Sequence, residues 1–261
     1  MPEGDTVWLA CRRLHESLAG AEVVRSDFRV PQHATVDLTG LRVLEVVSRG
    51  KHQLFRFSTG LTLHTHLRMD GSWHVYRPGT PRRGGPEHEV RVVLATAERE
   101  AVGYRLPVIE LLPTAAEDRA VGHLGPDLLG PDWDAAEALR RLALDPERSV
   151  GEALLDQRNL AGIGTLYRAE TLFLSGVHPR RPVGEVRDLA RVVARAQRLL
   201  SANRMHPEQS TTGDTRRGRQ HYVFERARQP CLRCATPIET EEFGPAGQER
   251  RSYWCPSCQP R

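Results

Sequence analysis

Four cysteines near the C-terminal end of the 261-residue chain have the spacing of a metal site. Cys231 and Cys234 form one Cys-x2-Cys pair, and Cys255 and Cys258 form a second pair after twenty intervening residues. Two such pairs can place four thiolates around one tetrahedral ion, which is the arrangement of a structural zinc ribbon. Because four sulfurs complete the coordination sphere, the predicted Zn2+ serves to fold a segment too short for its own core.

Amines at two positions could form a Schiff base with a sugar aldehyde. Lys51 is the only lysine among 37 Lys and Arg residues. This indicates that the position requires a compact charge, which the planar guanidinium of arginine cannot replace. If the initiator methionine is removed, Pro2 becomes a secondary amine, and the reference pKa of an α-amino group is about 8, against about 10.4 for lysine. Pro2 is therefore the more available nucleophile, and Glu3 could move protons. Alternatively, the Met-Pro-Glu start has no function and Lys51 remains by chance on a solvated strand.

A third candidate site is the glycine turn at Gly162 and Gly164, which leads directly into a helix expected from Thr165. Two glycines allow a ligand to approach the backbone closely, and the N-terminus of the next helix directs N–H groups at it. This geometry suits an anion. The alternative is a turn that serves packing alone, and a dinucleotide-binding fold is not expected because no strand precedes the turn.

Between the cysteine pairs, the sequence predicts a β-hairpin with strands at 240–243 and 250–254 and a turn at 244–247. Arg250 and Arg251 would then lie on a rigid finger, where they could bind phosphates. The alternative is an ordinary pair of solvated arginines.

The elements that must position these residues fall into two halves. In the first, residues 5–20 predict a helix capped by Asp5 and ended by Gly20, with Cys11 as an inert thiol on its apolar face. From about residue 21 to residue 119 the period changes to two, and closely spaced short strands indicate a β-sandwich or barrel. The expected strands are at 41–50, 52–60, 61–67, 72–78, 89–100 and 101–112.

A segment rich in Gly and Pro marks the boundary to a helical half. Helices are expected at 134–144, after a capping box of Ser149 and Glu152, at 165–176 and at 183–204. The fold class is therefore α+β. Its expected domains are a catalytic β-sandwich at 1–122, an interdomain linker at 123–133, a helical domain at 134–220 and a zinc finger at 221–261.

Composition is that of an ordinary globular protein, with 27% charged and 39% hydrophobic residues and a net charge of +4. This mild basic bias is compatible with an anionic partner without requiring one. We expect no signal peptide, and no run of about eighteen apolar residues is present to span a membrane. The chain is therefore expected to be cytoplasmic, with reduced cysteines.

Seven motifs occur in one order along the chain: MPEGDTV, SRGKH, HLRMDGSW, LGPDLL, LLDQRNLAGIG, TTGDTR and the paired cysteines. Together they resemble the formamidopyrimidine-DNA glycosylase/endonuclease VIII family over essentially the whole chain, most closely its second, actinobacterial type of endonuclease VIII. The resemblance implies a two-sheet β-sandwich flanked by helices, a helix–two-turns–helix DNA-binding domain and a zinc-ribbon finger. It also implies an enzyme that excises damaged bases and then cleaves the DNA strand at the abasic site, and that acts as a monomer associated with the nucleoid.

The resemblance implies roles for the candidate catalytic residues. Pro2 would attack C1′ of the damaged nucleotide, and Glu3 would protonate the ring oxygen of the deoxyribose. Lys51 would contact a phosphate near the lesion and transfer protons during elimination, and its charge would lower the pKa of the Pro2 amine. Arg250 would hold the phosphates beside the lesion and assist the second elimination.

A second group of residues is expected to contact damaged DNA. Because such an enzyme must rotate its target nucleotide out of the duplex, a side chain must fill the gap, and Met69 matches the family's void-filling residue. Alternatively, Met69 is an ordinary turn residue after a strand. The other residues expected to contact DNA are Arg68, His66, His123, Gly164, Thr165 and Arg251.

Two positions depart from the family pattern. Thr165 replaces an asparagine that usually binds phosphate; its hydroxyl has shorter reach and fewer donors, although it can cap the helix. We expect a weaker hold on the lesion strand without loss of function. Glu225 stands where glycine is common, which brings the local turn into question.

The expected activity is excision of oxidised bases, pyrimidines first, through a Schiff base on Pro2 followed by β,δ-elimination. Two alternatives remain. The same fold could act on oxidised purines or on abasic sites alone, or the chain could be a non-catalytic paralogue that binds damaged DNA. The presence of Pro2, Glu3 and Lys51 argues against the non-catalytic alternative, whereas Thr165 favours it.

Overall fold

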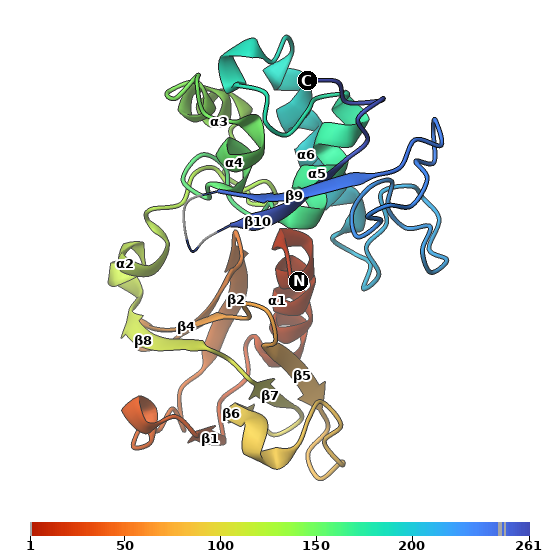
Figure 1. Cartoon of the computed structure of the whole chain (residues 1–261). Coiled ribbons are helices and arrows are strands. Elements are labelled where there is room, and N and C mark those ends of the chain that lie inside the picture. Colours follow the sequence, from red (N-terminus) through yellow and green to blue (C-terminus); the bar gives the residue numbers. More distant parts are fainter. Residues whose placement is uncertain (1, 245–246, 248) are drawn as a thin grey trace. The chain divides into compact units, whose positions relative to one another are not determined.

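The fold is given by a computed structural model, in which residues 2–244, 247 and 249–261 are described. The structure divides into two compact units, residues 1–123 and 124–261. The first unit contains one long helix and two sheets, and the second contains a group of helices and a hairpin (Figure 1). In the described part of the chain, no helix has the length and apolar character needed to cross a membrane.

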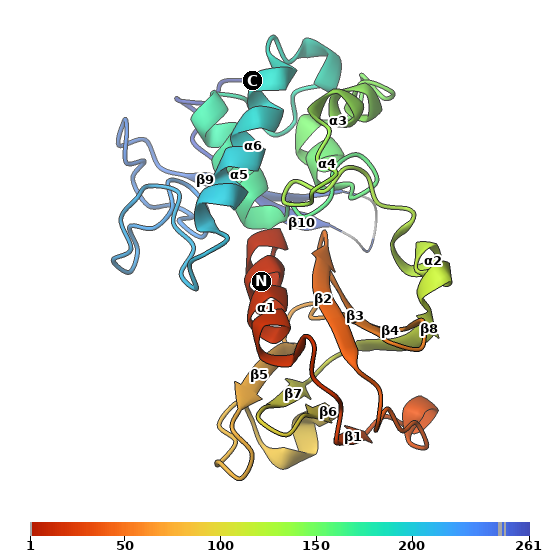
Figure 2. The same ribbon diagram turned by 180° about the vertical axis from the view of Figure 1, so that it is seen from behind.

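The first unit begins with helix α1 (Gly4–Leu18), which packs along strand β2 (Figure 2). The predicted apolar face is buried, with Val7, Cys11, Leu14 and Leu18 all 2% exposed or less. The predicted cap at Asp5 was wrong: Glu3 occupies the N-cap position and Asp5 lies in the first turn. The helix ends at Leu18 with Ala19 as its C-cap, and Gly20 follows with φ 81°.

Two four-stranded antiparallel sheets make up the rest of this unit, in the orders β1-β6-β7-β5 and β2-β3-β4-β8. One apolar core includes Phe28 of β1, Phe55 of β3 and Leu94 of β6, so it is shared by both sheets. The predicted β-sandwich is therefore confirmed. The strands are β1 (Arg25–Phe28), β2 (Val43–Arg49), β3 (His52–Phe57), β4 (Leu61–His66), β5 (Ser72–Tyr76), β6 (Val90–Ala95), β7 (Glu100–Tyr104) and β8 (Val108–Pro113).

Two details of the strand prediction were wrong. The single strand expected at 101–112 is two strands, β7 and β8, which belong to different sheets. Between them Arg105 has φ 49°, and the chain changes direction there. Strand β1 was not predicted at all. An alternating pattern shows which residues are extended, but not where the chain passes from one sheet to the other.

The second unit contains the predicted helices. These are α3 (Ala135–Leu142), α4 (Val150–Leu155), α5 (Thr165–Ser175) and α6 (Leu189–Asn203); the short α2 (Asp118–Val121) belongs to the first unit. As predicted, Ser149 caps α4 by accepting from the backbone N–H of Glu152, and Gly176 ends α5 with φ 68°.

The long helix expected at 183–204 was wrong at its start. Asp188 is the N-cap of α6, where its carboxylate accepts from the backbone N–H of Arg191. Residues 183–185 instead form a 3-10 turn, η4 (Val183–Glu185). Other 3-10 turns are η1 (Pro31–His33), η2 (Glu87–Glu89) and η3 (Thr114–Ala116).

A small C-terminal core packs on α5. The predicted hairpin is confirmed as β9 (Glu239–Phe243) and β10 (Arg250–Trp254), whereas its predicted turn lies partly outside the described residues. Ala169 and Phe173 of α5 share this core with the tail, so the tail gains apolar contacts that it is too short to make alone. The tail residues of the core are Val223, Cys231, Ile238, Tyr253 and Cys255.

A buried carboxylate fixes the segment that leads into this tail. Glu170 of α5 is 0% exposed, and its carboxylate accepts hydrogen bonds from the backbone N–H groups of Tyr222 (2.8 Å), Val223 (2.8 Å) and Phe224 (2.9 Å). The hydroxyl of Thr211 also donates to it. Charge-assisted bonds of this kind are the strong ones, and a buried charge needs them to be tolerated.

We predict that Glu170→Ala destabilises the protein by about 3 kcal/mol or more, because several buried N–H groups lose their acceptor. Chemical denaturation monitored by circular dichroism measures the change. Glu147→Ala is the control, since Glu147 is an exposed carboxylate in the same unit. Equal stability of the two variants would contradict the structural role of Glu170.

Candidate functional site

The N-terminal candidates lie at the start of α1. Glu3 is the N-cap residue, is 1% exposed, and accepts the backbone N–H of Val7 at its carbonyl oxygen at 3.0 Å. Pro2 precedes it and is half-buried. The N-terminus of a helix carries partial positive charge, which stabilises a carboxylate and disfavours a cation. The fold therefore holds an acidic group in a fixed position directly beside Pro2.

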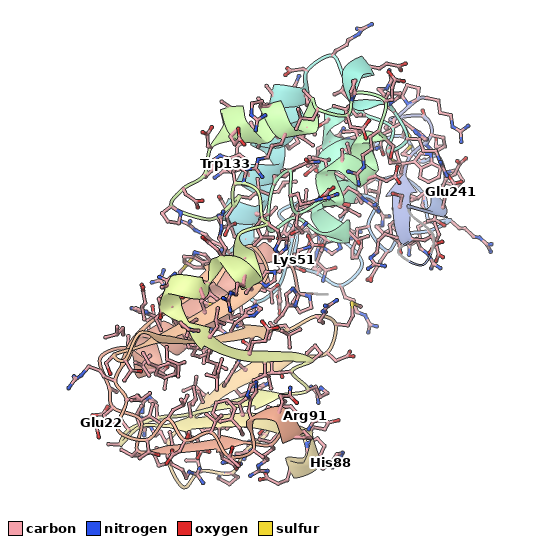
Figure 3. The ribbon with its side chains drawn as sticks, turned by 90° about the vertical axis from the view of Figure 1, so that its left-hand side faces the viewer. Glu22, Lys51, His88, Arg91, Trp133 and Glu241 are labelled. Carbon is pink, nitrogen blue, oxygen red and sulfur yellow. The ribbon has the colours of Figure 1, made fainter. Side chains whose placement is uncertain are left out.

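Lys51 lies at the tip of the hairpin between β2 and β3 (Figure 3). Arg49 and His52 pair across the hairpin, which leaves only Gly50 and Lys51 in the turn. Gly50 has φ 58°, a conformation that two-residue hairpin turns require and glycine adopts at little cost. Lys51 is thus on a turn and not on the solvated strand that was the alternative.

Four histidine rings gather beside this hairpin. The ring centroid of His52 on β3 lies 5.0 Å from that of His64, 4.8 Å from that of His66 and 6.0 Å from that of His123. Burial, reinforced by the neighbouring imidazoles and Arg68, lowers the pKa of His52 to about 3. Burial and the charges of Arg68 and Lys51 lower the pKa of His66 to about 4. Both rings are therefore neutral at pH 7.

The hydrogen bonds of His66 determine which ring nitrogen carries its proton. Its Nδ1 accepts from the backbone N–H of Arg68 at 2.8 Å, so the proton of the neutral ring is on Nε2. Nε2–H is a donor, and a donor suits a phosphate oxygen. Among the residues expected to contact DNA, the structure thus brings His66, Arg68 and His123 together with Lys51.

Sequence reasoning missed three residues here, namely His52, His64 and the carboxylate Glu110 that binds His64. His52 Nδ1 lies 2.8 Å from His64 Nε2, and His64 Nδ1 lies 2.8 Å from Glu110 Oε2. The available signal was the His-x-His pattern at 64 and 66, because residues two apart in a strand share a face. The partners on the adjacent strands could be found only once the register was known.

Met69 lies in a tight loop after β4. Arg68 has φ 50°, and the N–H of Gly71 donates to the carbonyl of Leu67 at 2.9 Å. A side chain at Gly71 would approach that carbonyl oxygen to 2.6 Å, so the loop requires glycine there. Met69 itself is 59% exposed.

The glycine turn is held by Gln157. Its Oε1 accepts the N–H of Gly162 at 3.0 Å, and its Nε2 donates to the carbonyl of Ile163 at 3.0 Å. Gly162 has φ 103°, which favours glycine. The expected cap at Thr165 was wrong: Gly164 is the N-cap, and Thr165 is the first helical residue, 8% exposed.

Glu225, the second departure from the family pattern, has an exposed side chain and φ 56°. The turn therefore keeps a left-handed backbone, the conformation for which glycine is the common residue.

The finger arginines differ in their contacts. Arg251 forms an ion pair with Glu242 across the hairpin at 2.8 Å, whereas the guanidinium of Arg250 donates to the carbonyl of Glu249. Both arginines are exposed. The carbonyl of Arg251 accepts from the guanidinium of Arg168 at 2.8 Å, so β10 is bonded to α5, the helix that begins at Thr165.

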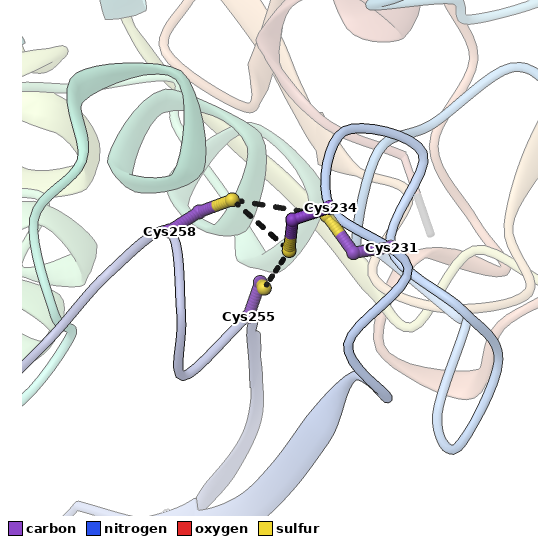
Figure 4. A group of neighbouring side chains, drawn as sticks. All are labelled: Cys231, Cys234, Cys255 and Cys258. Atoms are coloured by element: carbon purple, nitrogen blue, oxygen red, sulfur yellow. Dashed lines mark hydrogen bonds between the residues drawn. The ribbon is translucent and has the colours of Figure 1, made fainter.

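The four cysteines of the tail converge, and their Sγ atoms all lie within 4.8 Å of one another (Figure 4). Cys234 Sγ is 3.4 Å from Cys255 Sγ and 3.5 Å from Cys258 Sγ, and Cys231 Sγ is 3.9 Å from Cys258 Sγ. Zn–S bonds of about 2.3 Å place tetrahedral sulfurs about 3.8 Å apart, so the four thiols fit a zinc ion. Cys11, on α1, is buried in the first unit, where burial raises its pKa to about 12.

Comparison with known proteins places both units of the chain in one family. The family model for the formamidopyrimidine-DNA glycosylase N-terminal domain matches residues 1–106, and that for the formamidopyrimidine-DNA glycosylase H2TH domain matches residues 124–213. Over 99% of its length the chain is 59% identical to a probable endonuclease 8 2 of Streptomyces coelicolor, 94% of which is covered. It is 46% identical to the DNA-(apurinic or apyrimidinic site) lyase Nei2 of Mycolicibacterium smegmatis, with 99% of each chain covered.

Among solved structures, the formamidopyrimidine-DNA glycosylase of Lactococcus lactis bound to abasic-site DNA superposes with a TM-score of 0.82. The match covers 99% of this chain and 100% of that one at 22% identity, which establishes a common fold. With the family models and the closer relatives, it confirms the resemblance noted in the sequence. The chain belongs to the formamidopyrimidine-DNA glycosylase family of DNA-repair glycosylases and abasic-site lyases.

Proposed function

We propose that this DNA glycosylase and abasic-site lyase removes oxidised bases, pyrimidines before purines, through a Schiff base on Pro2, and cleaves the strand by β,δ-elimination. The observation that carries the proposal is the position of Pro2 directly before the buried N-cap Glu3 of α1. A secondary amine that bonds to C1′ gives an iminium ion, which cannot lose its charge by N–H deprotonation. It therefore remains an electron sink for the eliminations that follow.

In this mechanism Glu3 donates a proton to the ring oxygen of the deoxyribose while the Pro2 nitrogen bonds to C1′ and the base departs. The helix N-terminus favours the ionised form of Glu3 once the proton has been given. Lys51 contributes a compact charge on a rigid turn, where it can hold a backbone phosphate and transfer protons. Arg250 would bind the phosphates that flank the lesion and would assist the second elimination.

Damaged DNA is the proposed substrate, and further residues would position it. His66, Arg68, His123, Gly164, Thr165 and Arg251 offer donors to phosphates, and phosphate contacts dominate the affinity of such complexes. Met69 is exposed on a tight loop, as a residue that fills the place of an extruded nucleotide must be. A protein with this substrate is expected to associate with the nucleoid.

We further propose that Cys231, Cys234, Cys255 and Cys258 hold one structural Zn2+. The fit of their sulfurs to a tetrahedron supports this assignment. The ion would crosslink the two ends of the segment that contains β9 and β10, and so keep Arg250 on a rigid strand.

An abasic-site lyase with little base excision is the second candidate, because the 46% identical relative from Mycolicibacterium smegmatis is named a lyase. A panel of duplexes decides between them. The duplexes carry thymine glycol, dihydrouracil, a hydantoin, 8-oxoguanine or a preformed abasic site. We expect excision of the pyrimidine lesions and the hydantoin above 8-oxoguanine. Cleavage of the abasic duplex alone would support the second candidate.

Borohydride reduction should trap the protein on an abasic oligonucleotide, with the covalent bond at Pro2. Tryptic mass spectrometry of the adduct locates the bond. Chains that retain Met1 have no free amine at Pro2, so they serve as the internal control and should be absent from the adduct. A bond at Lys51, or full activity of a preparation in which every chain retains Met1, would overturn the proposal.

Lys51→Arg should reduce both base excision and strand cleavage at least about tenfold, because the planar guanidinium cannot give up a proton or take the place of the ammonium in the turn. Single-turnover assays on the preferred lesion measure both steps. Arg49→Lys, in the same hairpin, is the reverse exchange and should keep activity near that of the parent. Parent-like activity of Lys51→Arg would contradict a specific role for the ammonium.

The purified protein should contain about one zinc per chain by elemental analysis. Strong chelation or Cys255→Ser should remove the zinc, lower the thermal stability and abolish DNA binding, because the finger loses its crosslink. Cys11→Ala should keep the zinc, since Cys11 lies in the core of the first unit. Loss of zinc from Cys11→Ala, or its retention in Cys255→Ser, would contradict the four-cysteine assignment.

A further inference from the structure

Three side chains on neighbouring strands of the first unit form a continuous hydrogen-bonded chain, which we call the histidine relay: His52, His64 and Glu110. His52 Nδ1 is 2.8 Å from His64 Nε2, and His64 Nδ1 is 2.8 Å from Glu110 Oε2. The relay begins at the residue after Lys51 and ends at a carboxylate whose side chain is 58% exposed. His64 in the middle is 3% exposed.

Sheet register explains why these side chains meet. His64 of β4 pairs directly with Glu110 of β8, and His52 of β3 pairs with His66 of β4. Directly opposed residues have Cβ atoms about 5 Å apart, and diagonal neighbours such as His52 and His64 remain within reach of long side chains. The relay is therefore built by backbone pairing, on the face of the sheet opposite to Phe55 and Leu63 of the core.

The donors and acceptors of the relay allow two protonation states. An ionised carboxylate only accepts hydrogen bonds, so His64 carries a proton on Nδ1. If His64 is neutral, its Nε2 accepts from Nδ1–H of His52, and Nε2 of His52 is left as a base. If His64 is an imidazolium, both of its nitrogens donate, and His52 is neutral with its proton on Nε2. The two states differ by one proton.

The charges around the relay decide where that proton rests. His52 faces Arg68 and the rings of His66 and His123, and these with burial lower its pKa to about 3. A positive charge therefore does not stay on His52. His64 instead faces Glu110 and acts electrostatically on Glu117, a carboxylate that also binds Arg56. A proton taken up at His52 can pass along the hydrogen bond to His64, whose other ring nitrogen faces the carboxylate of Glu110.

We propose that the histidine relay accepts the proton released when the abasic sugar undergoes elimination, which makes His52 a general base of the lyase reaction and His64 and Glu110 its positioning residues. This inference rests on the function proposed above. The C2′–H bond breaks, its electron pair forms an enamine with the iminium carbon, and the proton bonds to Nε2 of His52. The Nδ1 proton of His52 passes to Nε2 of His64, which becomes an imidazolium paired with Glu110. The enamine then expels the 3′ phosphate with the C3′–O electron pair, and the relay returns its proton to water.

Two relay variants and one matched control test the proposal. Glu110→Gln removes the counter-charge but keeps an acceptor for His64, and His64→Phe breaks the relay. Glu45→Gln is the control, because Glu45 is a partly exposed carboxylate of the same sheet that binds Arg56 instead of a histidine. Each protein is assayed in single turnover on a duplex with a preformed abasic site, from about pH 5 to about pH 9. Borohydride trapping runs in parallel to measure imine formation, and deuterium at C2′ identifies the proton-removal step.

The relay must be unprotonated to act as a base. The cleavage rate of the unmodified protein should therefore fall as the pH is lowered. Glu110→Gln should shift this acid limb to lower pH, because the imidazolium loses its counter-charge. His64→Phe should slow cleavage about tenfold or more at neutral pH, with a smaller effect on trapping, and should lose the acid limb. Glu45→Gln should follow the parent profile.

Cleavage by Glu110→Gln and His64→Phe with the parent rate and pH profile would overturn the relay. Circular dichroism checks the fold of each variant. If His64→Phe does not fold, Glu110→Gln decides alone, since its altered side chain is largely exposed, and an unmoved acid limb overturns the proposal. Failure of the unmodified protein to be trapped would instead overturn the Pro2 Schiff base, and with it the reaction that the relay serves.

Discussion

The pairing register of the sheet β2-β3-β4-β8 is the constraint on which the candidate site in the first unit depends. Phe55 of β3 pairs with Leu63 of β4, and both are 0% exposed in the core. A slip of one residue would turn these side chains away from the apolar core and would turn the histidines into it. Apolar burial on one face therefore also fixes which polar groups meet on the other.

That register also explains why the backbone of Lys51 has a defined position. The hairpin between β2 and β3 closes with only Gly50 and Lys51, so the lysine has a defined position although its side chain is long. Next to it, the histidines offer both a donor, in His66, and a chain of hydrogen bonds that leads to Glu110. A compact cation and a proton path are thus supplied by one sheet.

In the second unit, the buried carboxylate of Glu170 holds the segment that leads into the C-terminal hairpin. The carboxylate of Glu170 collects backbone N–H groups from the segment before the zinc finger, and α5 gives the finger part of its apolar core. The finger is short, so it needs both this support and the crosslink expected from four thiolates. Its arginines are thereby carried on a strand bonded to the helix that starts at the glycine turn.

Sequence reasoning succeeded where the signal is local. The cap at Ser149 and the apolar face of α1 depend on neighbouring positions, and the structure has both as predicted, although Glu3 and not Asp5 is the N-cap of α1. It failed where a choice depended on distant residues. Val183 and Gly184 donate their backbone N–H groups to the carbonyls of Arg148 and Pro146 and so lie outside α6. The alternation at 101–112 continues although the chain changes sheets.

By itself, the sequence determined the family, the two pairs of cysteines and the candidate amines of Pro2 and Lys51, because each depends on residue type and on short spacing. Only the tertiary structure decided that His52, His64 and Glu110 form one chain of hydrogen bonds. Their strands are separated in sequence and meet through backbone pairing, and a pattern of period two shows the face of each residue but not its partner across the sheet.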